Sequence, residues 1–146
     1  MRTSTHTLAL AVSKDKAFDF LSRIENLPKW ATLFCKELKC DGMGRHKVVS
    51  PQGEIFFRIV ADSASGVIDM YGGPTEDAMA HWPTRIIPIG EDGSLFIFTA
   101  LQYPGLSDED FALQCKGLES EFPHIKANME AYKDLRLARE AAGEGR

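Results

Sequence analysis

Apolar and polar residues alternate along much of the chain with the two-residue period that is typical of β-strands. In the first such stretch, Leu8, Leu10 and Val12 fall on one face of the expected strand. A helical pattern follows, with Ser13 as its N-cap, and the segment Asn26–Pro28 starts a second short helix. The chain is therefore predicted to open with one strand and two short helices.

Between about Cys35 and Tyr103 the pattern is that of several strands separated by short turns. Turn residues such as Asp41-Gly42 and Gly72-Gly73 recur at the spacing of hairpin connections. This spacing predicts an antiparallel meander. In the last of these strands, residues 95–100, both faces are apolar, so the outer face is either covered or an oligomer surface.

The clearest amphipathic pattern follows this meander. Ser107 and Asp110 form an S-x-x-D version of the capping box at its start. Apolar residues then recur at alternating steps of four and three, at Phe111, Cys115, Leu118, Phe122, Ile125, Met129 and Tyr132. We expect a long helix with one continuous apolar face that runs to about residue 135.

Pro123 lies in the middle of this helical pattern and leaves two outcomes open. One is a single helix, bent where Pro123 removes the hydrogen bond to the carbonyl of Glu119, that follows a curved sheet. The other is two helices with a break before the proline. The apolar register continues across Pro123, which favours the single bent helix.

Composition and charge are those of an ordinary globular domain. The 146 residues are 44% hydrophobic and 26% charged, and we assign residues 1–136 to a single domain and residues 137–146 to a frayed tail. The net charge of −4 and the lack of a segment rich in Lys and Arg argue against a nucleic-acid partner. No apolar run has the form of a signal peptide or a membrane span, so we expect a cytoplasmic protein.

The cysteines indicate free thiols rather than a disulfide or a metal site. Their number is odd, with Cys35, Cys40 and Cys115. Cys35 and Cys40 together with His46 lack a C-x-x-C pair and a fourth ligand, so we predict no zinc site. Phosphate-binding, zinc-protease and serine-hydrolase motifs are missing from the sequence, and no cofactor is expected.

Six short segments carry a resemblance to a known superfamily. They are AFDFL at 17–21, NLPKW at 26–30, GVID at 66–69, PTRIIP at 83–88, DGS at 92–94 and PGLSDEDF at 104–111. With the order of the elements, they resemble the helix-grip fold of the START/SRPBCC superfamily, and within it the polyketide cyclase/dehydrase-like group. One departure is Met70, where relatives of this subgroup often place histidine.

The resemblance implies an α+β fold in which a curved antiparallel sheet wraps around the long C-terminal helix. It also implies a cavity between the two that holds a small hydrophobic or aromatic molecule. The candidate lining residues are Trp30, Phe34, Phe57, Trp82, Phe96, Phe98, Phe111, Cys115, Phe122 and Met129. For each of them the alternative is ordinary packing in the core.

Polar residues inside the strands supply the candidate chemistry. If the turn between the two strands centres near Pro74, Asp69 lies roughly opposite His81. A carboxylate that holds an imidazole sets its tautomer, and the pair, with Tyr71 nearby, would serve as a general acid or base. The alternative is a structural pair at the sheet surface.

Three hypotheses about function follow. The leading one is a binder of a small hydrophobic or aromatic molecule in the helix-grip cavity. The second is a cyclase- or dehydratase-like enzyme that uses Asp69, His81 and Tyr71, and it requires these groups to converge inside the cavity. The third is a protein-interaction module with a filled cavity and a functional apolar strand. Homodimers are compatible with each of them, and the fold alone does not decide among them.

Overall fold

The computed structural model describes the backbone of residues 1–141 and the side chains of residues 1–131. The strands are β1 (Thr3–Leu10), β2 (Glu37–Cys40), β3 (His46–Ser50), β4 (Gly53–Asp62), β5 (Val67–Thr75), β6 (Ala78–Trp82), β7 (Thr84–Ile89) and β8 (Gly93–Leu101). The helices are α1 (Lys14–Leu21), the 3-10 turn η1 (Ile24–Asn26), α2 (Leu27–Trp30) and α3 (Asp108–Ala141). The predicted order of strand, short helices, meander and long helix is confirmed.

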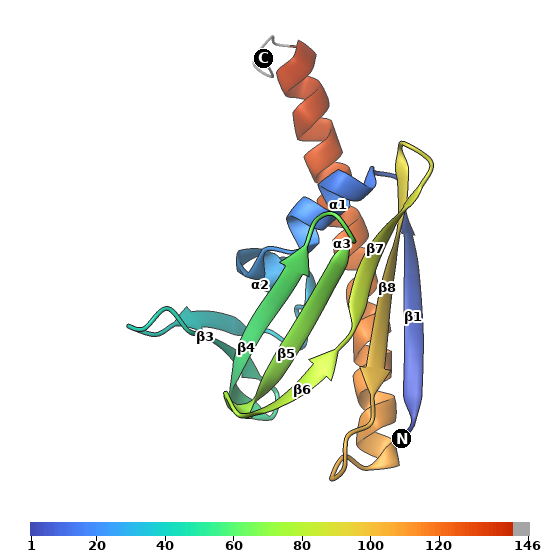
Figure 1. The fold of residues 1–146 in the computed structure, drawn as a ribbon. Helices are drawn as coiled ribbons and strands as arrows, with labels where there is room; N and C mark the ends of the chain where they lie inside the picture. The colour runs from blue at the N-terminus through green and yellow to red at the C-terminus, as the bar shows by residue number, and fades with distance from the viewer. Residues whose placement is uncertain (142–146) are drawn as a thin grey trace.

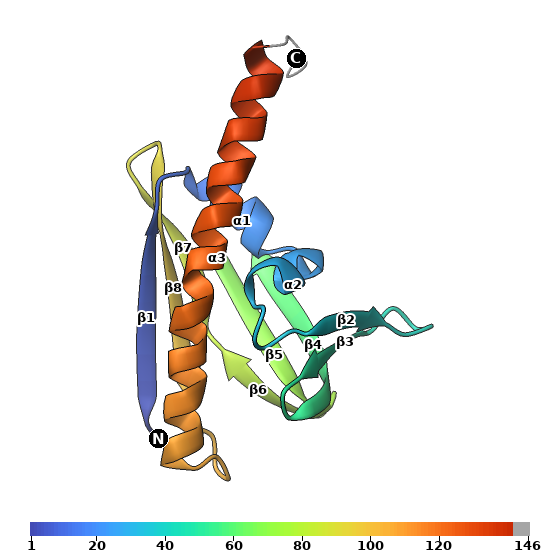
Figure 2. The ribbon, with the colours of Figure 1, turned by 180° about the vertical axis from the view of Figure 1, so that it is seen from behind.

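The strands form one antiparallel sheet that curves around α3 (Figures 1 and 2). Its order is β1-β8-β7-β5-β4-β3-β2, with β6 paired to β5. The first strand of the chain thus lies beside the last, because β1 pairs with β8 over nearly the whole length of both strands. The predicted fold class, a curved antiparallel sheet around a long C-terminal helix with two short helices after the first strand, is confirmed.

Pro83 divides what would otherwise be one long strand into β6 and β7. Proline has no backbone N–H for a sheet ladder, so it sits where the pairing changes. Before it, β6 pairs with β5, and after it, β7 pairs mainly with β8. The change of pairing partner at Pro83 therefore coincides with the residue that cannot donate to the ladder.

Polar side chains hold α3 against its neighbours. Nδ1 of His6 on β1 lies 2.9 Å from the carboxylate oxygen Oε1 of Glu119. Asn128 donates a hydrogen bond of 3.1 Å to the carbonyl of Lys29 on α2. The helix is therefore tied to both the edge strand and the short helices, and the space it encloses is fixed by contacts along its length.

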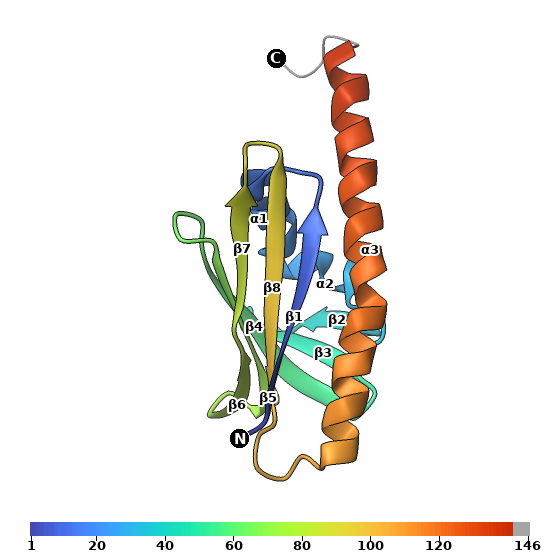
Figure 3. The ribbon, with the colours of Figure 1, turned by 90° about the vertical axis from the view of Figure 1, so that its right-hand side faces the viewer.

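Pro123 lies inside one continuous helix. The alternative of two helices is therefore wrong for this fold, and Figure 3 shows α3 as a gently curved rod without a break. The helix also extends past the expected end near residue 135, to Ala141. Residues 137–141 of the expected frayed tail are helical, and the rest of that tail lies outside the described residues. In the described part of the chain, no helix combines the length and hydropathy needed to cross a bilayer.

Candidate ligand cavity

A cavity of about 400 Å³ lies between α3, the short helix α2 and the loop after it, the strands β4, β5, β6 and β8, and the β3–β4 turn. Most of its lining is apolar. The residues that line it are Leu27, Trp30, Ala31, Leu33, Phe34, Lys36, Pro51, Gln52, Phe57, Met70, Trp82, Phe98, Ala100, Asp110, Leu113, Gln114, Gly117, Leu118 and Glu121. A few polar groups in an apolar hollow of this size are typical of small-molecule sites.

Three aromatic rings from separate elements form one wall of the cavity. Phe34 lies 5.5 Å from Phe57 and 6.0 Å from Trp82, between ring centroids, and the Phe57 and Trp82 rings are stacked. Gly72 leaves room for this arrangement, because an added Cβ would come within 2.9 Å of the Trp82 ring. A larger residue at position 72 would therefore displace the Trp82 ring from its present place in the wall.

Glu121 supplies the buried charge of the cavity. Its side chain is 4% exposed, and it is the only buried acid among the side chains of residues 1–131. Oε2 accepts two hydrogen bonds of 3.1 Å, from the backbone N–H groups of Leu33 and Phe34. Burial raises the pKa of Glu121, against the opposing effect of these N–H donors and of the Lys36 charge.

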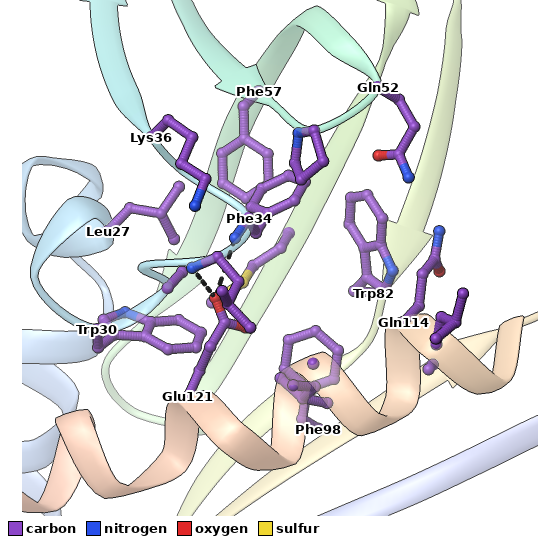
Figure 4. A pocket seen from close by; sticks show the side chains of 18 of the residues that line it. Leu27, Trp30, Phe34, Lys36, Gln52, Phe57, Trp82, Phe98, Gln114 and Glu121 are labelled. Atoms are coloured by element: carbon purple, nitrogen blue, oxygen red, sulfur yellow. Dashed lines mark hydrogen bonds between the residues drawn. The ribbon is translucent and has the colours of Figure 1, made fainter. Parts of the chain in front are cut away.

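The exposed edge of the cavity is mixed, with apolar residues beside the polar residues Lys36, Gln52, Asp110 and Gln114. Leu33 is 46% exposed and Leu113 is 62% exposed, and both line the cavity together with Pro51. Figure 4 shows Glu121 rising from α3 toward the loop that carries Lys36, with Gln114 farther along the helix. The edge of the cavity therefore offers both apolar surface and polar groups, whereas the Glu121 carboxylate is buried.

Five of the ten predicted lining residues lie at this cavity: Trp30, Phe34, Phe57, Trp82 and Phe98. The other five lie elsewhere: Phe96, Phe111, Cys115, Phe122 and Met129. Phe96 is fully buried and packs edge-on against Trp30 and Phe122. Phe111 lies under the guanidinium of Arg2. These residues fill the core around the cavity rather than facing it, with the exception of Cys115, which is only half-buried.

The helix faces the cavity with a different stripe from the one that the apolar pattern indicated. The cavity-facing residues Asp110, Gln114, Gly117 and Glu121 follow one another at steps of four, three and four, as the apolar stripe does beside them. Leu113 and Leu118 also line the cavity, and of all these helix residues only Leu118 belongs to the predicted apolar stripe. The sequence analysis did not include Glu121 among the candidate site residues. Its position three residues after Leu118, next to the predicted apolar stripe, was the signal in the sequence that it lies near the buried side of the helix.

Asp69, His81 and Tyr71 come together, but away from the cavity. Nε2 of His81 donates to Oδ1 of Asp69 at 2.8 Å, and the His81 and Tyr71 rings stack with centroids 4.6 Å apart. Tyr71, not Asp69, is the direct cross-strand partner of His81. Met70 between them is buried and lines the cavity, so the alternation of the strand places Asp69 and Tyr71 on the opposite, convex face.

The cysteine and histidine side chains do not assemble into a further site. Cys40 is the cross-strand partner of His46, whereas Cys35 is buried ahead of β2. Among the described side chains, no three His, Cys, Asp or Glu residues lie together as a metal ion would require.

Comparison with known proteins places the fold. No protein-family model matches the chain, and no curated protein matches it in sequence. Among solved structures, the protein XoxI from Bacillus cereus has a TM-score of 0.70 at 14% identity, over 91% of this chain and 99% of its own. A START superfamily protein from Mycobacterium smegmatis has a TM-score of 0.64 at 16% identity, over 89% and 98%.

The Zhui aromatase/cyclase from Streptomyces sp. R1128 is similar to the same extent, with a TM-score of 0.63 at 17% identity, over 88% of this chain and 93% of that one. These similarities extend over nearly the whole length of each protein. The chain therefore has the fold of these proteins, which is the helix-grip fold that the resemblance to the START/SRPBCC superfamily implied.

Proposed function

We propose that the protein binds a small hydrophobic or aromatic molecule in the cavity between α3 and the sheet. The observation that carries this proposal is the cavity itself, about 400 Å³ of space walled by aromatic rings. The hollow is open to water and lined mainly by apolar side chains, so an apolar ligand that covers this surface is favoured by the hydrophobic effect. The same space counts against an interaction module with a filled cavity.

The exposed edge supports the same function. Leu33 and Leu113 keep large apolar side chains exposed at the edge of the cavity. An apolar ligand that covers part of this surface removes it from water, which favours binding. The aromatase/cyclase with this fold is named for chemistry on aromatic compounds, which is compatible with an aromatic ligand here.

Enzymatic turnover has weaker support. The second hypothesis needs Asp69 and His81 inside the cavity, and this pair faces the convex side of the sheet. Glu121 is the one buried acid or base of the described cavity lining, and a single carboxylate held by two N–H groups fits binding without further chemistry.

The test is native mass spectrometry of the purified protein, followed by thermal melting with a panel of aromatic compounds. Gly117 offers a cavity-filling variant, because an added Cβ there meets only Leu33 Cδ1, at 3.9 Å. Gly117→Leu extends a side chain into the cavity and is expected to abolish copurifying ligand and compound-induced stabilisation. Gly117→Ala, the matched control, adds one methyl group and is expected to retain both.

The outcomes separate cleanly. A compound that copurifies with the wild type and the alanine variant but not with the leucine variant supports binding in the cavity. A wild type without bound compound that is stabilised by no member of the panel contradicts it. A ligand that persists in a folded Gly117→Leu variant would place binding elsewhere on the molecule.

A further inference from the structure

Glu121 has one carboxylate oxygen that the protein leaves open. Oε2 takes both backbone N–H donors, those of Leu33 and Phe34, and no described group donates to Oε1. In the described part of the chain, no sealed side-chain oxygen or nitrogen is without a hydrogen-bond partner. Oε1 is therefore not enclosed by the wall, and because Glu121 lines the cavity, the space open to Oε1 is the cavity.

We propose that the ligand carries a hydroxyl group that hydrogen-bonds to Oε1 of Glu121, so that the cavity selects neutral phenols and alcohols over compounds of equal size without a hydroxyl. This inference rests on the proposed function and names its ligand class. It makes Glu121 the residue that determines specificity in an otherwise apolar site.

The contacts of Glu121 favour a hydroxyl over an apolar group at this position. An apolar ligand would cover Oε1, remove its water and return no hydrogen bond, which costs affinity. An ether has the same defect toward a carboxylate, because its oxygen only accepts. A hydroxyl both donates and accepts, so it matches Oε1 whether the carboxyl group is ionised or protonated.

The cost of desolvation favours a neutral ligand over a cation. Lys36, whose charge lowers the pKa of Glu121, and Asp110 both line the cavity with exposed side chains, so its charged groups are of both signs. Oε2 of Glu121 already accepts two N–H donors. A ligand ammonium group would have to give up its water beside Lys36, and taking an ion out of water is costly even next to an opposite charge. A hydroxyl satisfies Oε1 without burying a further charge.

Three naphthalene derivatives test the proposal, because they differ at one substituent and fit a cavity of this size. They are 2-naphthol, 2-methoxynaphthalene and naphthalene, titrated by isothermal calorimetry at pH 7.5. We expect 2-naphthol to bind at least about tenfold more tightly than the other two, since each leaves Oε1 desolvated and unpaired. The cation 2-naphthylmethylammonium is expected to bind more weakly than 2-naphthol.

Glu121→Gln is expected to remove most of the preference for a hydroxyl group. The amide oxygen of glutamine can accept both backbone N–H groups, and its NH₂ group then faces the cavity as a donor. The advantage of 2-naphthol over 2-methoxynaphthalene is expected to fall to about twofold or less, because the ether oxygen can now accept. Glu130→Gln makes the same change at an exposed position of α3 and is expected to keep the wild-type ratio.

Each result has one meaning. Equal affinity of the wild type for all three neutral compounds overturns the hydroxyl proposal and leaves the proposed function standing. Tighter binding of the ammonium compound overturns it in favour of cations. Failure of all four to bind the wild type contradicts the proposed function and this inference together. If Glu121→Gln does not fold, as judged by circular dichroism, the wild-type ratios decide alone.

Discussion

Glu121 fastens the loop that follows α2 to the middle of α3, and this contact takes a carboxylate out of water. Two N–H donors and the charge of Lys36 favour its ionised form, while burial disfavours it more strongly, so the pKa of Glu121 is raised above its ordinary value of 4.5. Ionisation of Glu121 is therefore less favourable in the folded protein than in the unfolded chain, so it lowers the free energy of unfolding.

This gives a prediction about the pH dependence of stability. Between 4.5 and the raised pKa of Glu121, the native state binds more protons than the unfolded state, so its contribution to stability falls as pH rises through that window. Glu121→Gln removes this term. Its free energy of unfolding relative to wild type is expected to rise from pH 4 to pH 8 in urea titrations.

Two neighbouring groups are electrostatically coupled to this carboxyl group. The charge of Lys36 lowers the pKa of Glu121, and the charge of Glu121 raises the pKa of Cys35. Glu130→Gln, on the exposed side of the same helix, serves as the control and is expected to show no such slope. A difference between the Glu121→Gln variant and wild type that stays constant with pH would contradict the assignment of the shift to Glu121.

The three cysteines are predicted to differ in reactivity. Burial, and secondly the negative charge of Glu121, raise the pKa of Cys35 to about 11. At pH 8 only about one Cys35 in a thousand is a thiolate, the form that reacts with iodoacetamide. Cys40 is exposed and Cys115 half-buried. Pulsed alkylation with peptide mass spectrometry is expected to label Cys40 first and Cys35 last, and equal labelling of both would contradict this.

At the scale of elements, α3 shows what the apolar pattern could and could not predict. The position of the helix and its packed side followed from the spacing of Phe111, Phe122 and Met129, which the structure buries. The same spacing could not locate the cavity. Of the helix residues that face the cavity, Gly117 and Gln114 carry no apolar signal and Leu113 lies off the predicted stripe, so the spacing marked only Leu118.

Pro123 is predicted to destabilise α3 while leaving it continuous. The proline is exposed and lies within the helix, where it cannot donate the hydrogen bond to the carbonyl four residues earlier. Pro123→Ala restores that donor and is expected to raise the free energy of unfolding by about 1–3 kcal/mol, measured by urea titration. His124→Ala, at the exposed neighbouring residue, is the control and is expected to change it little.

A Pro123→Ala variant with a lower free energy of unfolding than wild type would contradict this prediction. It would indicate that the curvature of α3 in Figure 3 is needed for the helix to follow the sheet, as the bent-helix interpretation of the sequence supposed.

At the scale of the whole molecule, the sheet separates two groups of polar residues that the sequence analysis did not assign to faces. The pairing of Asp69 with His81 was predictable from the short hairpin between them. The turn, however, falls at Glu76 and Asp77, and the register shifts between Gly72 and Thr75. A shift of register decides which residues oppose each other, and a single hairpin does not fix it. The face does follow from alternation in β5, where Ile68 and Met70 are buried and Asp69 and Tyr71 point the other way.

The convex pair gives the last prediction. Asp69→Asn and His81→Ala are expected to leave the affinity for any cavity ligand within about twofold of wild type, because the sheet lies between the pair and the cavity. Calorimetric titration of each variant with 2-naphthol measures this. Both side chains are about 30% exposed, so the pair contributes under about 1 kcal/mol to stability, and the variants are expected to remain folded.

Gly117→Leu is the positive control in the same titration, since it changes the cavity directly. A folded Asp69→Asn variant that loses binding would mean either that β5 transmits a change of position to Met70 at the cavity wall, or that the ligand lies on the convex face. The two are distinguished by Gly117→Leu, which abolishes binding in the first case and preserves it in the second. Retained binding in both convex-face variants would leave the concave cavity, with Glu121 in its wall, as the site that recognises the ligand.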